Sequence, residues 1–134
     1  MDTDAPFPQQ VTWVYTEDLD DTAGFYAGVV GLTQVFDQGA CRIFQVTPAS
    51  FLGVCRARPG RQVEPRGVVV TFVCTETAGV DDWHRRLTEA GADLLGPPER
   101  HDDFNVYCFF ARDPNGYLLE VQSFLDPAWP GPGG

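Results

Sequence analysis

The sequence predicts an α+β fold in which two βαβββ modules form a curved mixed sheet around a central trough. A strand-like segment, a helix-like segment and three short strand-like segments follow one another, and this order occurs twice along the chain. The glycines predicted to end the two helices, Gly31 and Gly91, lie 60 residues apart. The 134 residues suit one core, so we expect a single domain over residues 1–134.

The first module is predicted to span about residues 10–56. It opens with VTWVYT (residues 11–16), whose β-branched and aromatic side chains are typical of a strand. Apolar residues then recur at helical spacing between Asp18, a suitable N-cap, and Gly31, a suitable helix end. Turn residues separate the three further strands that we predict, which are TQVF (33–36), CRIFQV (41–46) and FLGVC (51–55).

A crossover rich in proline, glycine and arginine, at about residues 57–66, leads to the second module at about residues 67–125. Residues 126–134 are predicted to form a flexible tail, in which Trp129 is able to dock on another surface. The predicted elements of this module are a buried strand at GVVVTFVC (67–74), a helix ended by Gly91, and strands at ADLL (92–95), NVYCFFA (105–111) and YLLEVQSF (117–124).

The charge of the chain restricts its partners. The formal net charge is −10, which argues against nucleic acid, since binding to a phosphate backbone depends on lysine and arginine. All nine basic residues are arginine, so the chain can form no Schiff base and has no P-loop lysine. It contains no apolar run long enough for a membrane span, and its acidic N-terminus does not resemble a secretory signal. We therefore expect a cytoplasmic protein without a membrane partner.

The four cysteines are widely spaced and lie in or beside strand-like runs, at Cys41, Cys55, Cys74 and Cys108. The sequence contains no CxxC pair and no cluster of cysteine with histidine. We therefore expect four reduced thiols that pack as small apolar side chains.

Two stretches carry a pattern that points to a known family. In DLDDTAGFYAGVVGL (18–32) the matching residues are Asp18, Leu19, Phe25, Tyr26, Gly31 and Leu32. In FFARDPNGYLLEVQSF (109–124) they are Phe110, Asp113, Pro114, Gly116, Glu120 and Val121. Together the stretches resemble the vicinal oxygen chelate superfamily over about residues 10–124. That superfamily includes glyoxalase I, extradiol dioxygenases and bleomycin-resistance proteins, so the fold alone does not decide the function.

The resemblance implies up to four metal ligands, one from each of four strands. The residues at the expected positions are Val11, a residue near Gly53, Val68 and Glu120, and only Glu120 offers an oxygen donor. We therefore predict that the chain uses no metal and no cofactor. The alternative requires a one-residue bulge in the first strand, which would bring Gln10 into the first ligand position beside Glu120.

The same strands predict a site for an organic ligand. Strand alternation places every second side chain on the trough side, and the resulting surface is apolar and aromatic with one carboxylate. Glu120 is then either a ligand contact or a structural partner of an arginine, for which Arg42 is the candidate. The predicted ligand-binding residues are Trp13, Tyr15, Phe51, Phe72 and Glu120.

Two functions are consistent with these observations. The first is a metal-free protein that sequesters a small, partly aromatic compound that can also be cationic, as the resemblance to bleomycin-resistance proteins implies. The second is a metal-dependent enzyme of the glyoxalase or dioxygenase type, with a non-standard ligand set that uses Gln10, Glu120 and a residue at the rim of the trough. In either case the resemblance implies a homodimer.

Overall fold

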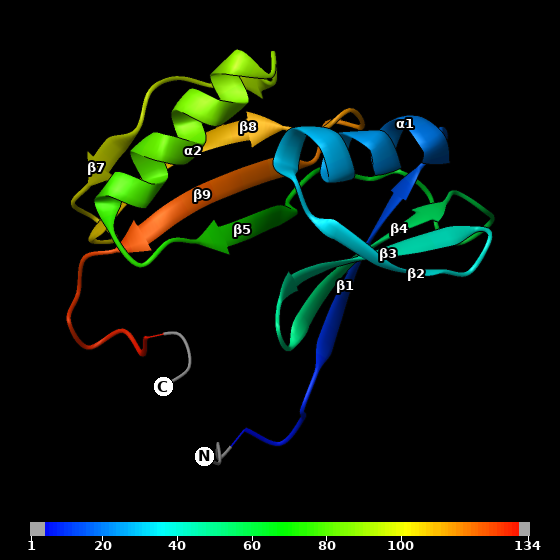
Figure 1. Cartoon of the computed structure of the whole chain (residues 1–134), viewed down its shortest axis with the longest axis horizontal. Coiled ribbons are helices and arrows are strands. Elements are labelled where there is room, and N and C mark those ends of the chain that lie inside the picture. Colours follow the sequence, from blue (N-terminus) through cyan, green and yellow to red (C-terminus); the bar gives the residue numbers. More distant parts are fainter. Residues whose placement is uncertain (1–4, 132–134) are drawn as a thin grey trace. The chain divides into compact units, whose positions relative to one another are not determined.

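The computed structural model describes residues 5–131, and contacts within the chain group it into two compact units, Met1–Glu64 and Pro65–Gly134. The boundary falls within the crossover that the sequence predicts. Each unit contains one helical segment and one mixed sheet (Figure 1). The predicted α+β class is therefore confirmed.

The first unit forms a four-stranded sheet in the order β1-β4-β3-β2. β1 pairs in parallel with β4, and the other neighbours are antiparallel. The helical segment between β1 and β2 lies along one face of this sheet (Figure 1). The elements are β1 (Gln10–Thr16), α1 (Leu19–Gly24), the π-helix η1 (Phe25–Val30), β2 (Thr33–Asp37), β3 (Cys41–Thr47) and β4 (Ser50–Arg56).

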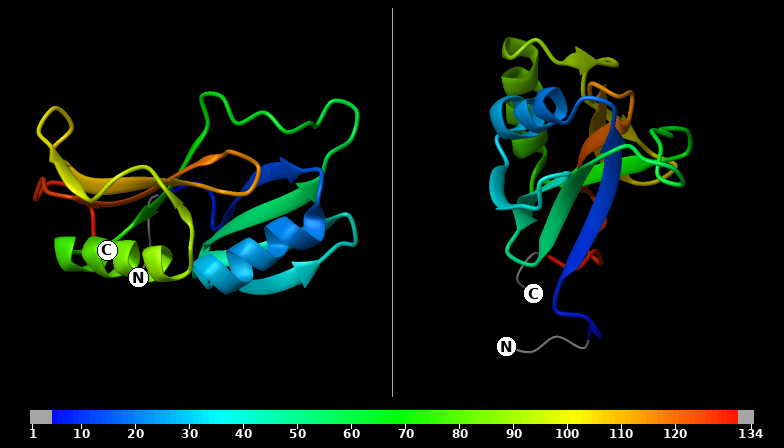
Figure 2. Two further views of the ribbon diagram at one scale, coloured as in Figure 1. Left: turned by 90° about the horizontal axis from the view of Figure 1, so that it is seen from above. Right: turned by 90° about the vertical axis from the view of Figure 1, so that its right-hand side faces the viewer.

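The second unit repeats this arrangement in the order β5-β9-β8-β6, again with its first strand parallel to its last. One additional short strand, which the sequence did not predict, pairs with β8. Figure 2 shows α2 running along one side of this sheet. The elements are β5 (Val69–Val73), α2 (Thr77–Glu89), β6 (Asp93–Leu94), β7 (Glu99–His101), β8 (Val106–Arg112) and β9 (Leu118–Phe124).

The predicted helix ends agree with the structure. Asp18 caps α1 by accepting a hydrogen bond from the backbone N–H of Asp21 at 3.1 Å, which satisfies one of the free donors of the first turn. Gly31 and Gly91 adopt positive φ angles of 85° and 78°, a conformation that glycine reaches without the steric cost of a Cβ.

Each helical segment covers an apolar sheet face. In the first unit, the hydroxyls of Thr16 and Thr22 form a buried hydrogen bond of 2.9 Å between β1 and α1. The buried apolar side chains of this unit include Val14, Tyr26, Phe44, Leu52 and Val54. Those of the second unit include Val80 and Leu87 from α2 and Phe109, Leu119 and Val121 from the sheet.

The expectation of four free thiols is wrong for two of them, because Cys41 and Cys55 form a disulfide. The pair is created by an irregularity between Gln45 and Thr47 in β3. Thr47 pairs with Ser50 at the hairpin turn, and an uninterrupted register would then place Cys41 opposite Arg56. The bulge shifts the register by one residue, so that Cys41 faces Cys55. Cys74 and Cys108 are free thiols, as expected.

Part of the segment predicted as a flexible tail forms contacts in the structure. The side chain of Asp126 accepts a hydrogen bond from the backbone N–H of Ala128, and its backbone carbonyl accepts one from the N–H of Trp129. These two hydrogen bonds form a turn. The indole of Trp129 stacks on Phe124 with ring centroids 3.7 Å apart. Residues 126–131 therefore include an ordered turn, while residues 132–134 lie outside the described part of the chain.

Within residues 5–131, neither α1, η1 nor α2 has the length and apolar character that a membrane-crossing helix requires.

Candidate ligand-binding faces

The first candidate surface is the side of the first sheet opposite α1 and η1, which we call the Trp13 face. In the register of β1 and β4, Trp13 pairs with Gly53, Tyr15 with Cys55, and Val11 with Phe51. Paired residues point to the same side of a sheet, so Trp13, Tyr15 and Phe51 share one face. Trp13 keeps 39% of its surface exposed.

The indole of Trp13 lies directly on the backbone of Gly53. A Cβ added at Gly53 would overlap the six-membered ring of Trp13. Glycine at this position therefore leaves room for the six-membered ring of Trp13 against the backbone of β4. Such a ring offers a stacking surface for a planar ligand.

The structure does not contain the bulge that the metal hypothesis requires. The pairing of β1 with β4 is regular from Gln10, opposite Ser50, to Thr16, opposite Arg56. Alternation along β1 then places Gln10 on the side of Val14, which is the helix-covered side. Gln10 therefore lies on the side of β1 opposite to Trp13.

The second candidate surface is the side of the second sheet opposite α2, which we call the Glu120 face. Glu120 lies on the central strand β9, between Thr71 on β5 and Phe110 on β8. Leu118 and Gln122 share its side of β9 by alternation. Phe124 follows on the same side and carries the stacked ring of Trp129.

Phe72 does not belong to this face. It pairs with Val121, which is buried, and its side chain therefore points to the side that α2 covers. The prediction counted alternate residues from Val68, but β5 begins one residue later, at Val69. Gly67 has a φ of 77° and lies in a turn closed by a hydrogen bond from the N–H of Val68 to the carbonyl of Pro65. A shift of one residue exchanges the two faces of a strand.

The carboxylate of Glu120 accepts hydrogen bonds from two neighbouring side chains. The hydroxyl of Thr71 donates to Oε1 at 2.8 Å, and the thiol of Cys108 donates from the next strand. Burial, together with this hydrogen bond to Glu120 and the negative charges of Glu120 and Glu99, raises the pKa of Cys108 to about 12. Cys108 is therefore a protonated donor at neutral pH and not a nucleophile.

The predicted arginine partner of Glu120 is found elsewhere. Arg42 projects from β3 to the helix side of the first sheet and forms an ion pair of 2.6 Å with Asp20 on α1. Its Nε is buried without a hydrogen-bond partner. The proposed pairing of Arg42 with Glu120 is therefore wrong, and the observed partners of Glu120 are a hydroxyl and a thiol.

The turn before β9 fixes the direction of the strand that carries Glu120. Asp113 is buried, and its Oδ1 accepts hydrogen bonds from the N–H groups of Asn115 at 2.8 Å and Tyr117 at 3.0 Å. Gly116 completes the turn with a φ of 89°. The Asp-Pro-Asn-Gly sequence therefore acts as a structural turn that starts β9 in register with β8.

Several residues of the Glu120 face were missed from the sequence. Thr71 is one residue away from the predicted Phe72, and Phe110 and Cys108 come from a strand that was predicted but given no role. Cross-strand neighbours such as these become visible only when the register of β8 and β9 is known. The contact of Trp129 was predicted only as docking on an unspecified surface.

The residues present do not fit the metal centre that the fold suggests. On the Glu120 face, β5 contributes Val69, Thr71 and Val73, and only the Thr71 hydroxyl, already bonded to Glu120, is polar. Among the described residues there is no group of three or more His, Cys, Asp or Glu side chains arranged to hold a metal ion. A single carboxylate with a hydroxyl is a weak donor set for a catalytic divalent ion.

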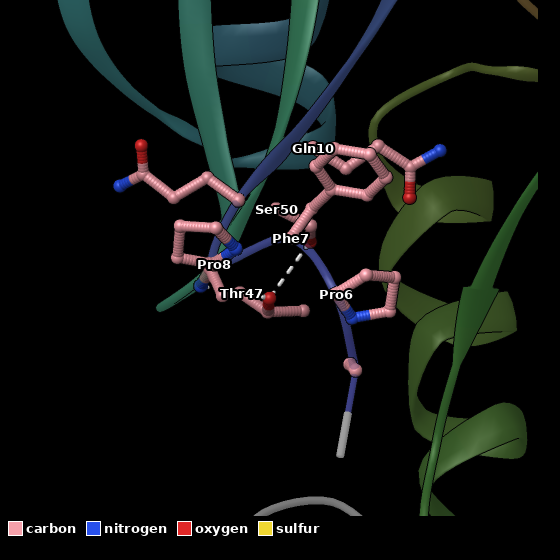
Figure 3. Close-up of a pocket in the computed structure, with 9 residues that line it drawn as sticks. Pro6, Phe7, Pro8, Gln10, Thr47 and Ser50 are labelled. Carbon is pink, nitrogen blue, oxygen red and sulfur yellow. Dashed lines mark hydrogen bonds between the residues drawn. The ribbon is translucent and has the colours of Figure 1, made fainter. Parts of the chain in front are cut away.

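A shallow hollow of about 500 Å³ lies at the start of β1 (Figure 3). It is formed by the segment before β1, including Pro6, Phe7 and Pro8, and by the turn between β3 and β4. The hydroxyls of Thr47 and Ser50 bond to each other at 2.7 Å in its wall. The hollow lacks an ionisable side chain, so it offers fewer fixed polar groups for orienting a ligand than the Glu120 face does.

The two units have the same strand order. Each has a helix on one face of its sheet and polar and aromatic residues on the other face, and this arrangement defines a duplicated βαβββ protein. The chain belongs to the Glyoxalase/Bleomycin resistance protein/Dioxygenase superfamily, whose family model matches residues 9–121. The resemblance stated from the two sequence motifs is therefore confirmed.

Solved structures support the same fold. The chain is similar to a glyoxalase/bleomycin resistance protein/dioxygenase from Nocardioides, with 23% identity and a TM-score of 0.76 over 99% of this chain and 93% of that one. It is also similar to a lactoylglutathione lyase from Agrobacterium tumefaciens, with 24% identity and a TM-score of 0.72 over 89% and 95% of the two chains.

One curated relative shares a shorter stretch. The metallothiol transferase FosB of Shouchella clausii (strain KSM-K16) is 40% identical over 48 residues, which are 36% of this chain and 33% of that protein. The similarity thus spans about a third of the relative.

Proposed function

We propose that the protein is a metal-free binding protein that sequesters a small compound with a planar aromatic part and a cationic or hydroxylated group. The observation that carries this proposal is the environment of Glu120. Its carboxylate is held by Thr71 and Cys108 on a face with aromatic side chains, and the neighbouring strand positions provide no second strong metal donor.

The Trp13 face of the first unit is, by itself, a candidate surface for a planar aromatic group. The indole of Trp13 is fixed against Gly53 on one side and partly exposed on the other, as a stacking surface must be. Tyr15 and Phe51 occupy the same side of the sheet and extend this surface. A ring that stacks here displaces water from an apolar surface, which contributes to affinity.

The Glu120 face of the second unit is, by itself, a candidate surface for a cationic or hydroxylated group. A carboxylate has about four lone-pair directions, and two donors occupy part of them, so an incoming ammonium or hydroxyl group can donate to the rest. Phe110 lies directly across from Glu120 and offers a ring to the same ligand group. The net charge of −10 also favours the approach of a cation.

A thermal-shift screen against cationic aromatic compounds tests this proposal. A compound that binds the folded state stabilises it by RT ln(1 + [L]/Kd) and so raises the Tm, and at least one such compound should stabilise the protein. Trp13→Ala should abolish the shift of a compound that stacks on the Trp13 face, and Glu120→Gln should abolish the shift of a compound that binds the Glu120 face. Trp83→Ala is the matched control, because Trp83 lies on α2 and contacts Arg86, and it should leave the shift intact.

The second candidate is a metal-dependent enzyme, which the 48-residue similarity to a metallothiol transferase favours. In this chain the ligands would have to include Glu120. The donor set described above argues against it, and metal titration distinguishes the two candidates.

We also propose that the protein acts as a cytoplasmic homodimer, as the family resemblance implies. Light scattering coupled to size-exclusion chromatography tests the dimer, since a dimer should have twice the chain mass of 14.8 kDa at micromolar concentration. A mass of one chain over this concentration range would exclude it.

A further inference from the structure

The disulfide between Cys41 and Cys55 lies at one end of the Trp13 face. Cys55 pairs with Tyr15 on one side and with Cys41 on the other, so the three side chains form one row across β1, β4 and β3. The adjacent row contains Trp13, Gly53 and Ile43. The two sulfur atoms are therefore part of the same surface as the aromatic side chains.

The strands hold the two cysteines together independently of the S–S bond. The N–H of Arg56 donates to the carbonyl of Ala40 at 2.8 Å, and the N–H of Gln38 donates to the carbonyl of Cys41 at 2.8 Å. Directly opposed residues of an antiparallel pair have their Cβ atoms about 4.5–5.5 Å apart. The β3–β4 hairpin already closes the 14-residue separation, so the same backbone accommodates both the dithiol and the disulfide.

Cys41 is the more exposed of the two cysteine residues, although both are largely buried. It is the first residue of β3 and follows the exposed turn at residues 37–40. Its exposed fraction is 9%, compared with 4% for Cys55. An external thiol or disulfide therefore reaches Cys41 first, from the end of the hairpin.

We propose that Cys41 and Cys55 form a reversible dithiol–disulfide site that exchanges with low-molecular-weight thiols and disulfides of the glutathione type. In the oxidising direction, the thiolate of Cys41 attacks one sulfur of the small disulfide, whose S–S bond breaks and releases one small thiolate. The thiolate of Cys55 then attacks the Cys41 sulfur and releases the second. The protein loses two electrons and two protons, and the small disulfide becomes two thiols.

The redox state also changes the surface beside Tyr15 and Trp13. The disulfide ties β3 to β4 at this row, whereas two thiols occupy the row as separate side chains that rotate and donate weak hydrogen bonds. We therefore expect the affinity for an aromatic ligand to differ between the two states. This effect on affinity rests on the proposed function, but the exchange reaction does not.

A redox titration of the full chain tests the exchange. The protein is equilibrated in buffers of increasing glutathione disulfide to glutathione ratio, the free thiols are trapped with a maleimide, and the modified peptides are identified by mass spectrometry. Cys41 and Cys55 should lose their labelling together in one two-electron transition, and should regain it when reductant is added back. Labelling at Cys74, a partly exposed free thiol, serves as the internal control and should not follow this transition.

The reduced protein must remain folded for the proposal to hold. Circular dichroism of the reduced protein should match that of the oxidised protein, and its Tm should fall by a few degrees with a single cooperative transition. The variant Cys41→Ser/Cys55→Ser should reproduce the reduced state. Four results would each overturn the proposal. They are independent titration of the two cysteines, thiols that stay reduced at every ratio, a disulfide that resists excess dithiothreitol, and unfolding of the protein on reduction.

The effect on binding is measured separately, with whichever cationic aromatic compound raises the Tm in the screen. A difference of at least threefold in its Kd between the oxidised and reduced protein supports the coupling, and equal Kd values overturn it. If no compound binds, the proposed function fails while the exchange reaction is still decided by the thiol labelling.

Discussion

Replacing Gly53 by alanine perturbs the stacking surface at its centre. The new Cβ would overlap the ring of Trp13, so the indole must leave its position across β4. An aromatic side chain buries about 150–250 Å², so displacing an indole that is now 39% exposed uncovers roughly 100 Å². At about 25 cal/mol per Å², the loss is about 2.5 kcal/mol as an upper value, and partial repacking reduces it to about 1–2 kcal/mol.

Denaturant unfolding and tryptophan fluorescence measure this change. The emission of Trp13 is isolated in a background in which Trp83 and Trp129 are replaced by phenylalanine, and it should shift toward longer wavelength as the indole becomes hydrated. Gly28→Ala is the matched control, because a Cβ there meets nothing within 4 Å. It should be neutral or stabilising by about 0.5–1 kcal/mol.

A double-mutant cycle separates the clash from other effects. In Trp13→Ala/Gly53→Ala the new methyl group has no ring to displace, so the loss should be smaller than the sum of the two single losses. The reasoning is refuted if Gly53→Ala leaves both the free energy of unfolding and the Trp13 emission unchanged, or if the two losses simply add.

Three further predictions concern the second unit. Glu120→Gln should lower the pKa of Cys108 and speed the alkylation of this thiol at pH 9–10. The pKa should not return to its ordinary value, because burial is the larger cause of the shift. An unchanged dependence of the alkylation rate on pH would contradict the contact between Cys108 and Glu120. The Cys108 thiol keeps its proton to about pH 12 in the folded protein, whereas in the unfolded chain it loses the proton near pH 9.0. The free energy of unfolding should therefore fall between these two pH values, by up to about 1.4 kcal/mol per pH unit. Cys74 and Tyr107 also have raised pKa values and act in the same direction, so the test is a shallower alkaline slope in Cys108→Ala than in the parent protein. Asp113→Ala should lower the free energy of unfolding in urea by about 3 kcal/mol, because two N–H groups lose a charged acceptor. Asp113→Asn should lower it by less. Equal losses in the two variants would argue against the role of Asp113 as the acceptor in this turn.

The sequence predicted the first unit better than the second for a physical reason. β1 is regular from Gln10 to Thr16, so alternation counted from residue 11 assigns Trp13 and Tyr15 to the correct face. β5 follows a turn at Gly67 whose positive φ delays the strand start, and a count from residue 68 therefore assigns Phe72 to the wrong face.

Pairing between strands was not accessible from the sequence. The Cys41–Cys55 disulfide depends on a bulge near Val46, which shifts the hairpin register by one residue. The neighbours of Glu120 come from β8, the preceding strand, and from β5, which is distant in sequence. Local patterns predict elements and faces, but they carry no information on which residues of two strands lie opposite each other.

The central claim is that Glu120 binds an organic group and not a metal ion. Calorimetric titration of the chelator-treated protein with Ni²⁺, Zn²⁺, Mn²⁺ and Fe²⁺ tests it most directly, with Glu120→Ala measured in parallel. We predict that none of these ions binds stoichiometrically with a Kd below about 10 µM. A Kd of this size corresponds to a binding free energy of about 7 kcal/mol. Stoichiometric binding of any of these ions that is lost in Glu120→Ala would contradict the claim.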